Sequence, residues 1–292
     1  MMEGPAAVPS AGQAPLPARR PPGRRSGPAQ RAVQRLAAAL KRERPDVAVD
    51  ADGRVARMRD LLVPSALPAA QGSGMLIDRP RTPVDDPLAL TANCFLPWSG
   101  QESRLRLANL EGFHELRFAA RCPTGIRGTP PQTDLLLTGV QDVVGVVTRV
   151  TEHLTVPRTK LADGYDHQQR EPRLDAWYDL LAQLRRSPGI FRLLDAAGLA
   201  KHAIGLAHTF PRRRTALVYL FWEPTDARAF PIFAAHRAEV EMLRRMVTEG
   251  AVPLLPMSVR ELWDSWRAEA PAGWLRDHLT FLLARYGVAI GD

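Results

Sequence analysis

Two neighbouring runs of hydrophobic residues contain the side chains with the clearest chemical potential. The run "TDLLL" (133–137) places Asp134 near its beginning, and "VVGVVTRV" (143–150) contains Val147, Thr148 and Arg149. Alternate residues of a β-strand point to the same face, so positions 147 and 149 would face the same way. An acid and a lysine at these positions, beside Asp134, would bind Mg²⁺ and activate a water molecule.

This chain departs from that chemistry at two of the three positions. Val147 has no ligand atom, and Arg149 stays protonated, so it cannot serve as a base. None of the three lysines of the chain has an acid two residues before it, so no displaced Asp-x-Lys or Glu-x-Lys exists. An arginine could still hold a phosphate or stabilise negative charge. The motif therefore predicts a site that keeps one carboxylate and lacks the second acid and the base.

Other residues could complete or extend such a site. A second carboxylate could come from the next expected helix, which offers Glu171, Asp175 and Asp179, although all three also suit a solvent-facing helix surface. Glu152 has the wrong parity for the strand face of Val147 unless a bulge intervenes. Three consecutive arginines precede a later strand and could contact phosphates, or they could form a solvated turn; they are Arg212, Arg213 and Arg214.

The elements expected around these residues form a mixed α/β sheet in one domain. We expect a helix at 86–97, strands at 113–122, 133–137 and 143–150, a helix at 173–186, and a strand at 215–222 that is buried on both faces. Alternation in the first strand predicts one inward face, made of Leu116, Phe118, Ala120 and Cys122. Further helices are expected at 231–247, 258–266 and 274–287, the second opened by a capping box at Ser258 and Glu261. Prolines restrict 251–257 to an edge strand.

The order of helix, three strands, helix and strand resembles the core of the PD-(D/E)xK nuclease superfamily. The resemblance covers roughly residues 85–266 and is closest to restriction-endonuclease-like members. "GTPPQTDLLL" is similar to the family segment that carries the first aspartate, and "GVVTRVTEHL" lines up with the Glu-x-Lys segment. The resemblance implies Asp134 and Thr148 as metal positions for Mg²⁺, and Asp134 and Arg149 as catalytic positions. It also implies DNA as the partner and no small-molecule cofactor.

Composition divides the chain into three parts. Residues 1–28 contain few large apolar side chains, and we expect a disordered arm. Residues 29–84 are expected to form a helix and a linker, and residues 85–292 the folded domain with extra C-terminal helices. Residues 1–44 hold nine Lys or Arg and two acids, so most of the net charge of +8 lies there. The basic arm suits either a solubilising tail or non-specific affinity for nucleic acid.

The chain has no features typical of a membrane or disulfide-stabilised protein. No apolar run approaches the 18 residues that suggest a membrane span. The two cysteines, Cys94 and Cys122, form neither a disulfide framework nor a metal-binding spacing. We therefore expect a cytoplasmic protein without membrane attachment.

Three functional hypotheses follow from these observations. The first is a degenerate relative of restriction-type nucleases that still associates with nucleic acid but has an impaired or lost hydrolytic site. The second is an active, Mg²⁺-dependent DNA endonuclease whose rearranged site uses Asp134 and an acid of the following helix. The third is a protein-interaction module whose partners meet the C-terminal helices.

Overall fold

The structure of the protein is a computed structural model. It describes residues 27–71, 77–155, 161, 164–167, 171–269 and 273–291. The expected arm, 1–28, lies almost entirely outside the described residues.

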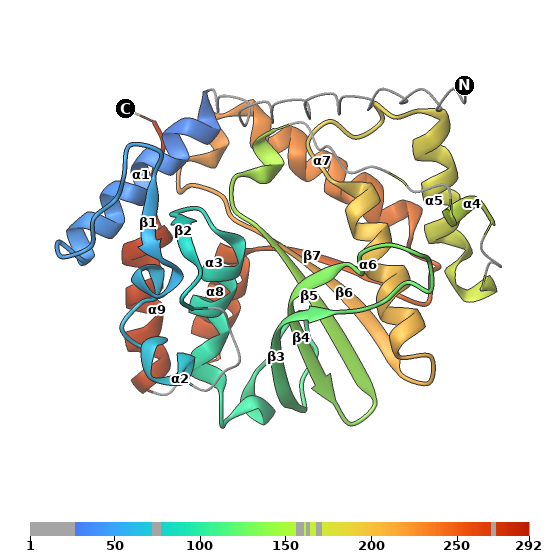
Figure 1. The fold of residues 1–292 in the computed structure, drawn as a ribbon, viewed down its shortest axis with the longest axis horizontal. Helices are drawn as coiled ribbons and strands as arrows, with labels where there is room; N and C mark the ends of the chain where they lie inside the picture. Colours follow the sequence, from blue (N-terminus) through green and yellow to red (C-terminus); the bar gives the residue numbers. More distant parts are fainter. Residues whose placement is uncertain are drawn as a thin grey trace, which may run out of the picture.

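A five-stranded mixed sheet forms the centre of the molecule (Figure 1). Its strands in spatial order are β3 (Phe113–Arg121), β4 (Gln132–Gly139), β5 (Asp142–Arg149), β6 (Arg214–Phe221) and β7 (Leu254–Ser258). The first three strands are antiparallel neighbours, whereas β6 and β7 run parallel to β5. The strands expected at 133–137 and 143–150 are confirmed, and they pair antiparallel with Leu135 opposite Val146.

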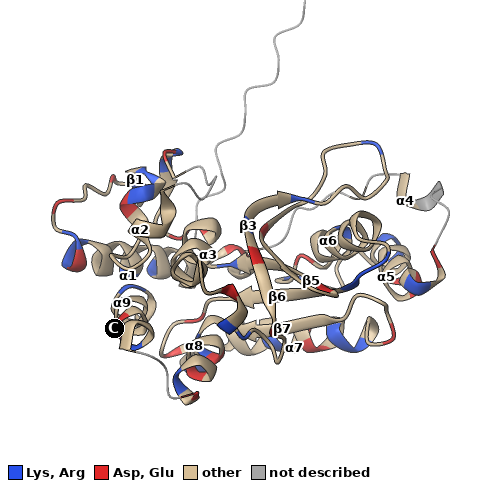
Figure 2. Cartoon of the chain, turned by 90° about the horizontal axis from the view of Figure 1, so that it is seen from below, with Lys and Arg blue, Asp and Glu red and all other residues tan. Residues whose placement is uncertain are grey.

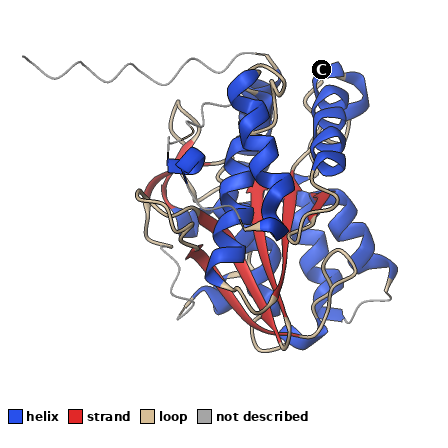
Figure 3. Ribbon diagram, turned by 90° about the vertical axis from the view of Figure 1, so that its right-hand side faces the viewer, coloured by secondary structure: helices blue, strands red, loops and turns tan. Residues whose placement is uncertain are grey.

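Helices cover both faces of this sheet (Figure 3). Along β4, β5 and β6, successive side chains point alternately into two hydrophobic cores, one on each side of the sheet. One core includes side chains of α1, α3, α8 and α9, and the other includes side chains of α5, α6 and the second half of α7. The helices are α1 (Pro28–Glu43), α2 (Leu67–Ala70), α3 (Pro87–Phe95), α4 (Gly164–His167), α5 (Asp175–Arg186), α6 (Ala196–Thr209), α7 (Pro231–Met246), α8 (Val259–Ala268) and α9 (Gly273–Tyr286). Within the described part of the chain, no helix has the length and apolar character needed to cross a membrane.

The inward face expected for β3 is split between the two cores. Leu116 and Phe118 pack against the core that contains α3, whereas Ala120 and Cys122 belong to the core that contains α6. Ala119 lies between the two pairs with a φ of 52°, in the left-handed region. A residue in that region interrupts the regular alternation of a strand. The sequence pattern alone could not show this reversal.

The C-terminal part of the fold follows the sequence closely. β7 pairs only with β6 among the described strands, as expected for an edge strand. The capping box is present, because Ser258 Oγ accepts from the Glu261 amide and Glu261 accepts from the Ser258 amide at 2.6 Å. Helix α6 was not expected, because most of its residues are buried and its sequence therefore lacks the apolar and polar alternation of a surface helix.

Residues 29–84, expected to be a helix and a linker, are part of the same packed structure. They include the two-stranded sheet of β1 (Arg54–Arg57) and β2 (Pro80–Pro83), and α1 packs against α9 (Figure 1). Glu43 at the end of α1 forms an ion pair with Arg285 of α9 at 2.8 Å, with side chains 14% and 3% exposed. Arg285 also donates to the Leu61 carbonyl at 3.0 Å. Residue 85, where we expected the folded domain to begin, therefore does not separate two independently packed parts of the chain.

Replacing Arg285 with alanine should destabilise the fold by about 3–5 kcal/mol, because Glu43 would keep a buried charge without its partner. The control is Arg276→Ala, an exposed arginine on the same helix, which should change stability by less than about 0.5 kcal/mol. Urea unfolding measures both. Equal, small effects of the two changes would show that α1 contributes little to the folded state.

Candidate functional site

Asp134, Thr148 and Arg149 meet where β4 begins and β5 ends. The Thr148 amide donates to Asp134 Oδ2 at 2.7 Å. Arg149 Nη1 donates to the Thr148 carbonyl at 2.6 Å and lies 3.9 Å from Asp134 Oδ2. The predicted proximity of Asp134 to the second strand is confirmed. The Arg149 guanidinium therefore lies against both residues that were expected to hold a metal.

The oxygen atoms of this site do not fit a Mg²⁺ ion. Mg²⁺ needs a near-octahedral set of oxygen ligands. The Thr148 carbonyl already accepts from Arg149, and its hydroxyl is hydrogen-bonded to Thr91 of α3 at 2.7 Å. Val147 is 1% exposed and belongs to the apolar core. Across the described residues, no group of three His, Cys, Asp or Glu side chains is placed to hold a metal ion. Asp134 is thus left as a single carboxylate beside a fixed cation.

Burial controls the charges of the pair. The side chains of Asp134 and Arg149 are 16% and 23% exposed. Burial raises the pKa of Asp134 to about 6, although the positive charge of Arg149 and the hydrogen bond from Thr148 oppose the rise. Burial also disfavours the charge of Arg149, but Asp134 and Glu152 more than offset it and raise the pKa of the guanidinium. Arg149 therefore remains a cation at every physiological pH.

Three acids that sequence reasoning did not place in the site lie around the end of β5. Glu152 accepts from the backbone amides of Val150 and Thr151 at 2.8 and 3.1 Å, so its carboxylate turns back toward β5. Asp85 accepts from the Thr151 hydroxyl. Asp86 belongs to the same end of the sheet, because its charge contributes to the raised pKa of Asp134.

Asp86 has a structural role that the sequence could have indicated. Its carboxylate accepts from the Ala89 amide at 2.9 Å and caps α3, and its other oxygen pairs with Arg79. An aspartate followed by proline is a common signal for the beginning of a helix. Its proximity to Asp134, however, depends on the packing of α3 against β4 and β5. The sequence signal therefore predicts the cap and not the position in the site.

The acids proposed for a rearranged site lie at the other end of the sheet. Glu171 pairs with Arg173. Arg173 donates to the carbonyl of Pro211 at 3.1 Å, and Pro211 lies shortly before the beginning of β6. Asp175 and Asp179 are exposed on α5. Because β5 and β6 are parallel, the beginning of β6 is remote from the end of β5, where Arg149 lies. The structure does not bring these acids to Asp134.

The three arginines proposed to contact nucleic acid are also at this opposite end. Arg213 donates to the carbonyls of Gly139 and Gln141, and Arg214 pairs with Asp142 at 2.7 Å. These contacts hold the β4–β5 turn to the beginning of β6. Arg212 is exposed. Lys and Arg are interspersed with Asp and Glu over the described elements (Figure 2). The arginine triplet does not extend the site of Asp134, because Arg214 pairs with Asp142 at the beginning of β5 and Arg149 lies at its end.

A buried histidine cluster adjoins Arg149 and was not expected. The rings of His153 and His236 lie 4.3 Å apart, and the Tyr219 hydroxyl is 3.0 Å from His236 Nε2. Burial lowers the pKa of His236 to about 3, and burial, His236 and Arg149 together lower that of His153 well below its usual value. Both histidines are therefore neutral at neutral pH. His153 thus adds an uncharged ring close enough to Arg149 for the positive charge to lower its pKa.

Comparisons of the chain with protein-family models, curated proteins and solved structures gave no significant match.

Replacing Asp134 with asparagine should change how stability depends on pH. The pKa of Asp134 in the folded state, about 6, is above its usual value of 3.8. Protonation of Asp134 contributes its full stabilisation of the folded state below pH 3.8, and this contribution is lost as the pH rises through about 6. Over this pH range the free energy of unfolding of the wild type should fall by up to about 3 kcal/mol relative to that of the Asn variant. Urea unfolding of both proteins from pH 4 to 7.5 measures the difference.

The control for this series is Asp175→Asn, which changes an exposed carboxylate of α5. The free energy of unfolding of Asp175→Asn should depend on pH in the same way as that of the wild type. A constant difference between wild type and Asp134→Asn across the range would contradict the raised pKa.

Proposed function

We propose that the protein is a degenerate, restriction-endonuclease-like relative of the PD-(D/E)xK superfamily that associates with nucleic acid and has lost Mg²⁺-dependent phosphodiester hydrolysis. The observation that carries this proposal is the position of Arg149. Its guanidinium lies against the Asp134 carboxylate and the Thr148 carbonyl, the two groups expected to hold the metal.

The chemistry of a guanidinium explains why such a site would not hydrolyse DNA. A divalent metal both neutralises phosphoryl charge and lowers the pKa of a bound water. Arg149 can supply positive charge and hydrogen bonds to a phosphate, but it cannot bind water as a Lewis acid or remove its proton. Val147 supplies no carboxylate to replace either function. The site keeps electrostatic attraction for phosphate and lacks a means of making the nucleophile.

The arrangement of elements supports the family proposal. Helix α3 precedes three antiparallel strands, α4, α5 and α6 follow, and β6 returns parallel to β5. The resemblance implies this order for residues 85–266, but with a single helix before β6 where the structure has three. Asp134 and residues 147–149 then fall on neighbouring strands, where that superfamily carries its acidic site. The alternative of an active, rearranged site is less favoured, because Glu171 and α5 lie at the opposite end of the sheet. There Arg173 donates to the Pro211 carbonyl before β6, and Trp177 of α5 donates to the Val252 carbonyl before β7.

The charge of the chain supports association with nucleic acid. The net charge is +8 at pH 7, and residues 1–44 contain nine of the 39 Lys and Arg but only two of the 31 acids. A basic segment of this kind increases affinity for a polyanion through release of counterions, without sequence specificity. Such binding needs no divalent ion.

The wild type should show no Mg²⁺- or Mn²⁺-dependent cleavage of plasmid DNA. The double variant Val147→Glu with Arg149→Lys would place a carboxylate and a lysine on the face of Asp134, and it should gain detectable cleavage. Adding Asp134→Ala to this double variant should abolish the gain. Gel electrophoresis of supercoiled plasmid, with circular dichroism to check folding, measures all three proteins.

Wild-type cleavage that disappears in Asp134→Ala would overturn the degenerate assignment and favour an active site assembled from Asp134 and other groups. Fluorescence anisotropy with a labelled duplex at low salt tests the second half of the proposal. Binding should occur in the presence of a chelator and weaken steeply as salt increases. No binding at low salt would contradict association with nucleic acid.

A further inference from the structure

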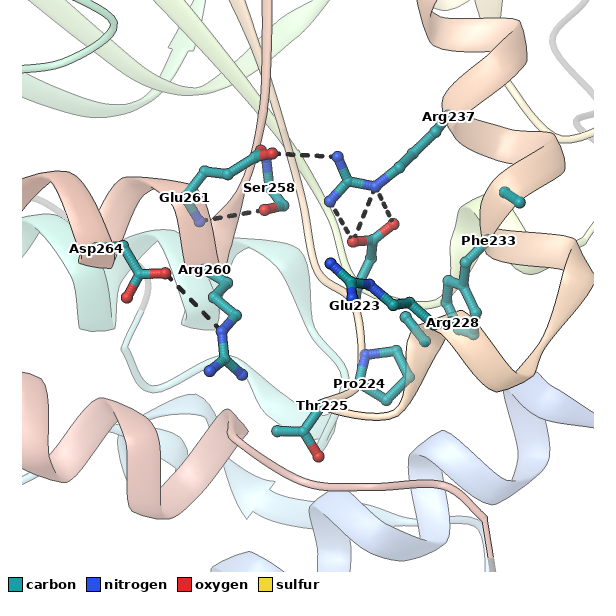
Figure 4. Close-up of a pocket in the computed structure, with 12 residues that line it drawn as sticks. Glu223, Pro224, Thr225, Arg228, Phe233, Arg237, Ser258, Arg260, Glu261 and Asp264 are labelled. Carbon is teal, nitrogen blue, oxygen red and sulfur yellow. Dashed lines mark hydrogen bonds and ion pairs between the residues drawn. The ribbon is translucent and has the colours of Figure 1, made fainter.

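A cleft with a volume of about 710 Å³ opens beyond the carboxyl ends of β6 and β7 (Figure 4). Its walls come from the turn after β6, the first turns of α7 and the beginning of α8, which contribute Glu223, Arg228, Phe233, Ser258 and Arg260, among others. The carboxyl ends of parallel strands are a common location for ligands in open α/β sheets. The cleft is also large enough for a small organic ligand.

One wall of the cleft is held rigidly by a network of charges. Arg237 of α7 donates to Glu223 through Nε at 2.9 Å and to Glu261 through Nη1 at 3.1 Å. The guanidinium also lies over the Phe221 ring, 5.3 Å from its centroid. Glu223 and Glu261 are therefore already paired with a cation. The two glutamates therefore repel an anionic ligand less strongly than two unpaired carboxylates would.

Two other arginines point into the cleft with much less compensation. The nearest acid to Arg260 is Asp264, at 3.9 Å, and Asp264 also pairs with Arg267 at 2.9 Å. Arg228 has no ion pair with any described residue of the chain. Figure 4 shows the Arg228 and Arg260 side chains entering the cleft from different elements, the turn after β6 and α8. Two guanidinium groups that line one cleft from separate elements can donate several hydrogen bonds to an anion bound between them.

The helices add to the same electrostatic preference. The first turns of α7 and α8 both line the cleft, through Phe233 and Ala234 of α7, the N-cap Ser258, and Arg260 and Glu261 of α8. The beginning of a helix carries a partial positive charge. Helix ends of this kind strengthen the field of the arginines, which remain the direct donors.

We propose that this cleft is a phosphate-binding site in which Arg228 and Arg260 donate to phosphoryl oxygens and the Arg237 network fixes the opposite wall. Guanidinium forks match phosphate geometry, and both groups are exposed and available. The phosphoryl group could belong to a nucleic acid backbone or to a free phosphorylated compound. The inference rests on the cleft and not on the loss of hydrolysis at Asp134, so the two can fail separately.

Isothermal titration calorimetry with pyrophosphate, ATP without divalent ions, and a short DNA duplex tests the site. The wild type should bind at least one of these probes. The double variant Arg228→Ala with Arg260→Ala should lose at least tenfold in affinity for it. Arg186→Ala, an exposed arginine at the end of α5, should stay within twofold of the wild type.

The probe that loses affinity identifies the source of the phosphate. Loss for pyrophosphate or ATP indicates a free phosphorylated ligand, and loss for the duplex alone indicates the nucleic acid backbone. The proposal is overturned if the wild type binds none of the probes, or if the double variant binds them as the wild type does. Thermal melting confirms that each variant is folded, and single variants replace the double one if its melting temperature falls.

Discussion

The buried positive charge of Arg149 is the constraint on which this end of the molecule depends. A guanidinium taken out of water is costly unless charges and hydrogen bonds compensate it. Here the Asp134 carboxylate, the Thr148 carbonyl and the nearby charge of Glu152 provide that compensation. Their positions require the β4–β5 hairpin and the turn that follows β5. The strand pairing and the local electrostatics are therefore parts of one arrangement.

The same charge shapes the groups around it. His153 is buried, and the positive charge of Arg149 helps to keep it neutral. Its neighbour His236 is kept neutral by burial and by Arg237, and it is hydrogen-bonded to the Tyr219 hydroxyl. Val147 contributes only apolar surface at the position where a nuclease of the proposed family would present an acid. The result is a site in which a fixed positive charge lies beside the Asp134 carboxylate. Such a site suits attraction of an anion more than activation of water.

Much of the fold could be predicted from the sequence because the relevant signals are local. Strand alternation located β4 and β5, the continuous apolar run located β6, and Ser258 with Glu261 marked the beginning of α8. Features set by distant contacts could not be predicted. The packing of α1 depends on the pairing of Glu43 with Arg285, 242 residues away. The reversal at Ala119 depends on a backbone angle that the residue type does not favour.

The candidate site was predictable in its centre and not in its surroundings. The resemblance and the expected strands at 133–137 and 143–150 indicated Asp134, Thr148 and Arg149. The positions of Asp85 and Asp86 depend on how α3 packs, and the remoteness of Arg212 to Arg214 depends on the direction of β6. Mn²⁺ binding measured by electron paramagnetic resonance tests directly whether the Arg149 guanidinium takes the place of the metal. We expect the wild type to leave the spectrum of free Mn²⁺ unchanged, and Val147→Glu with Arg149→Lys to bind the ion only when Asp134 is present. Tight binding by the wild type that is lost in Asp134→Ala would contradict this expectation.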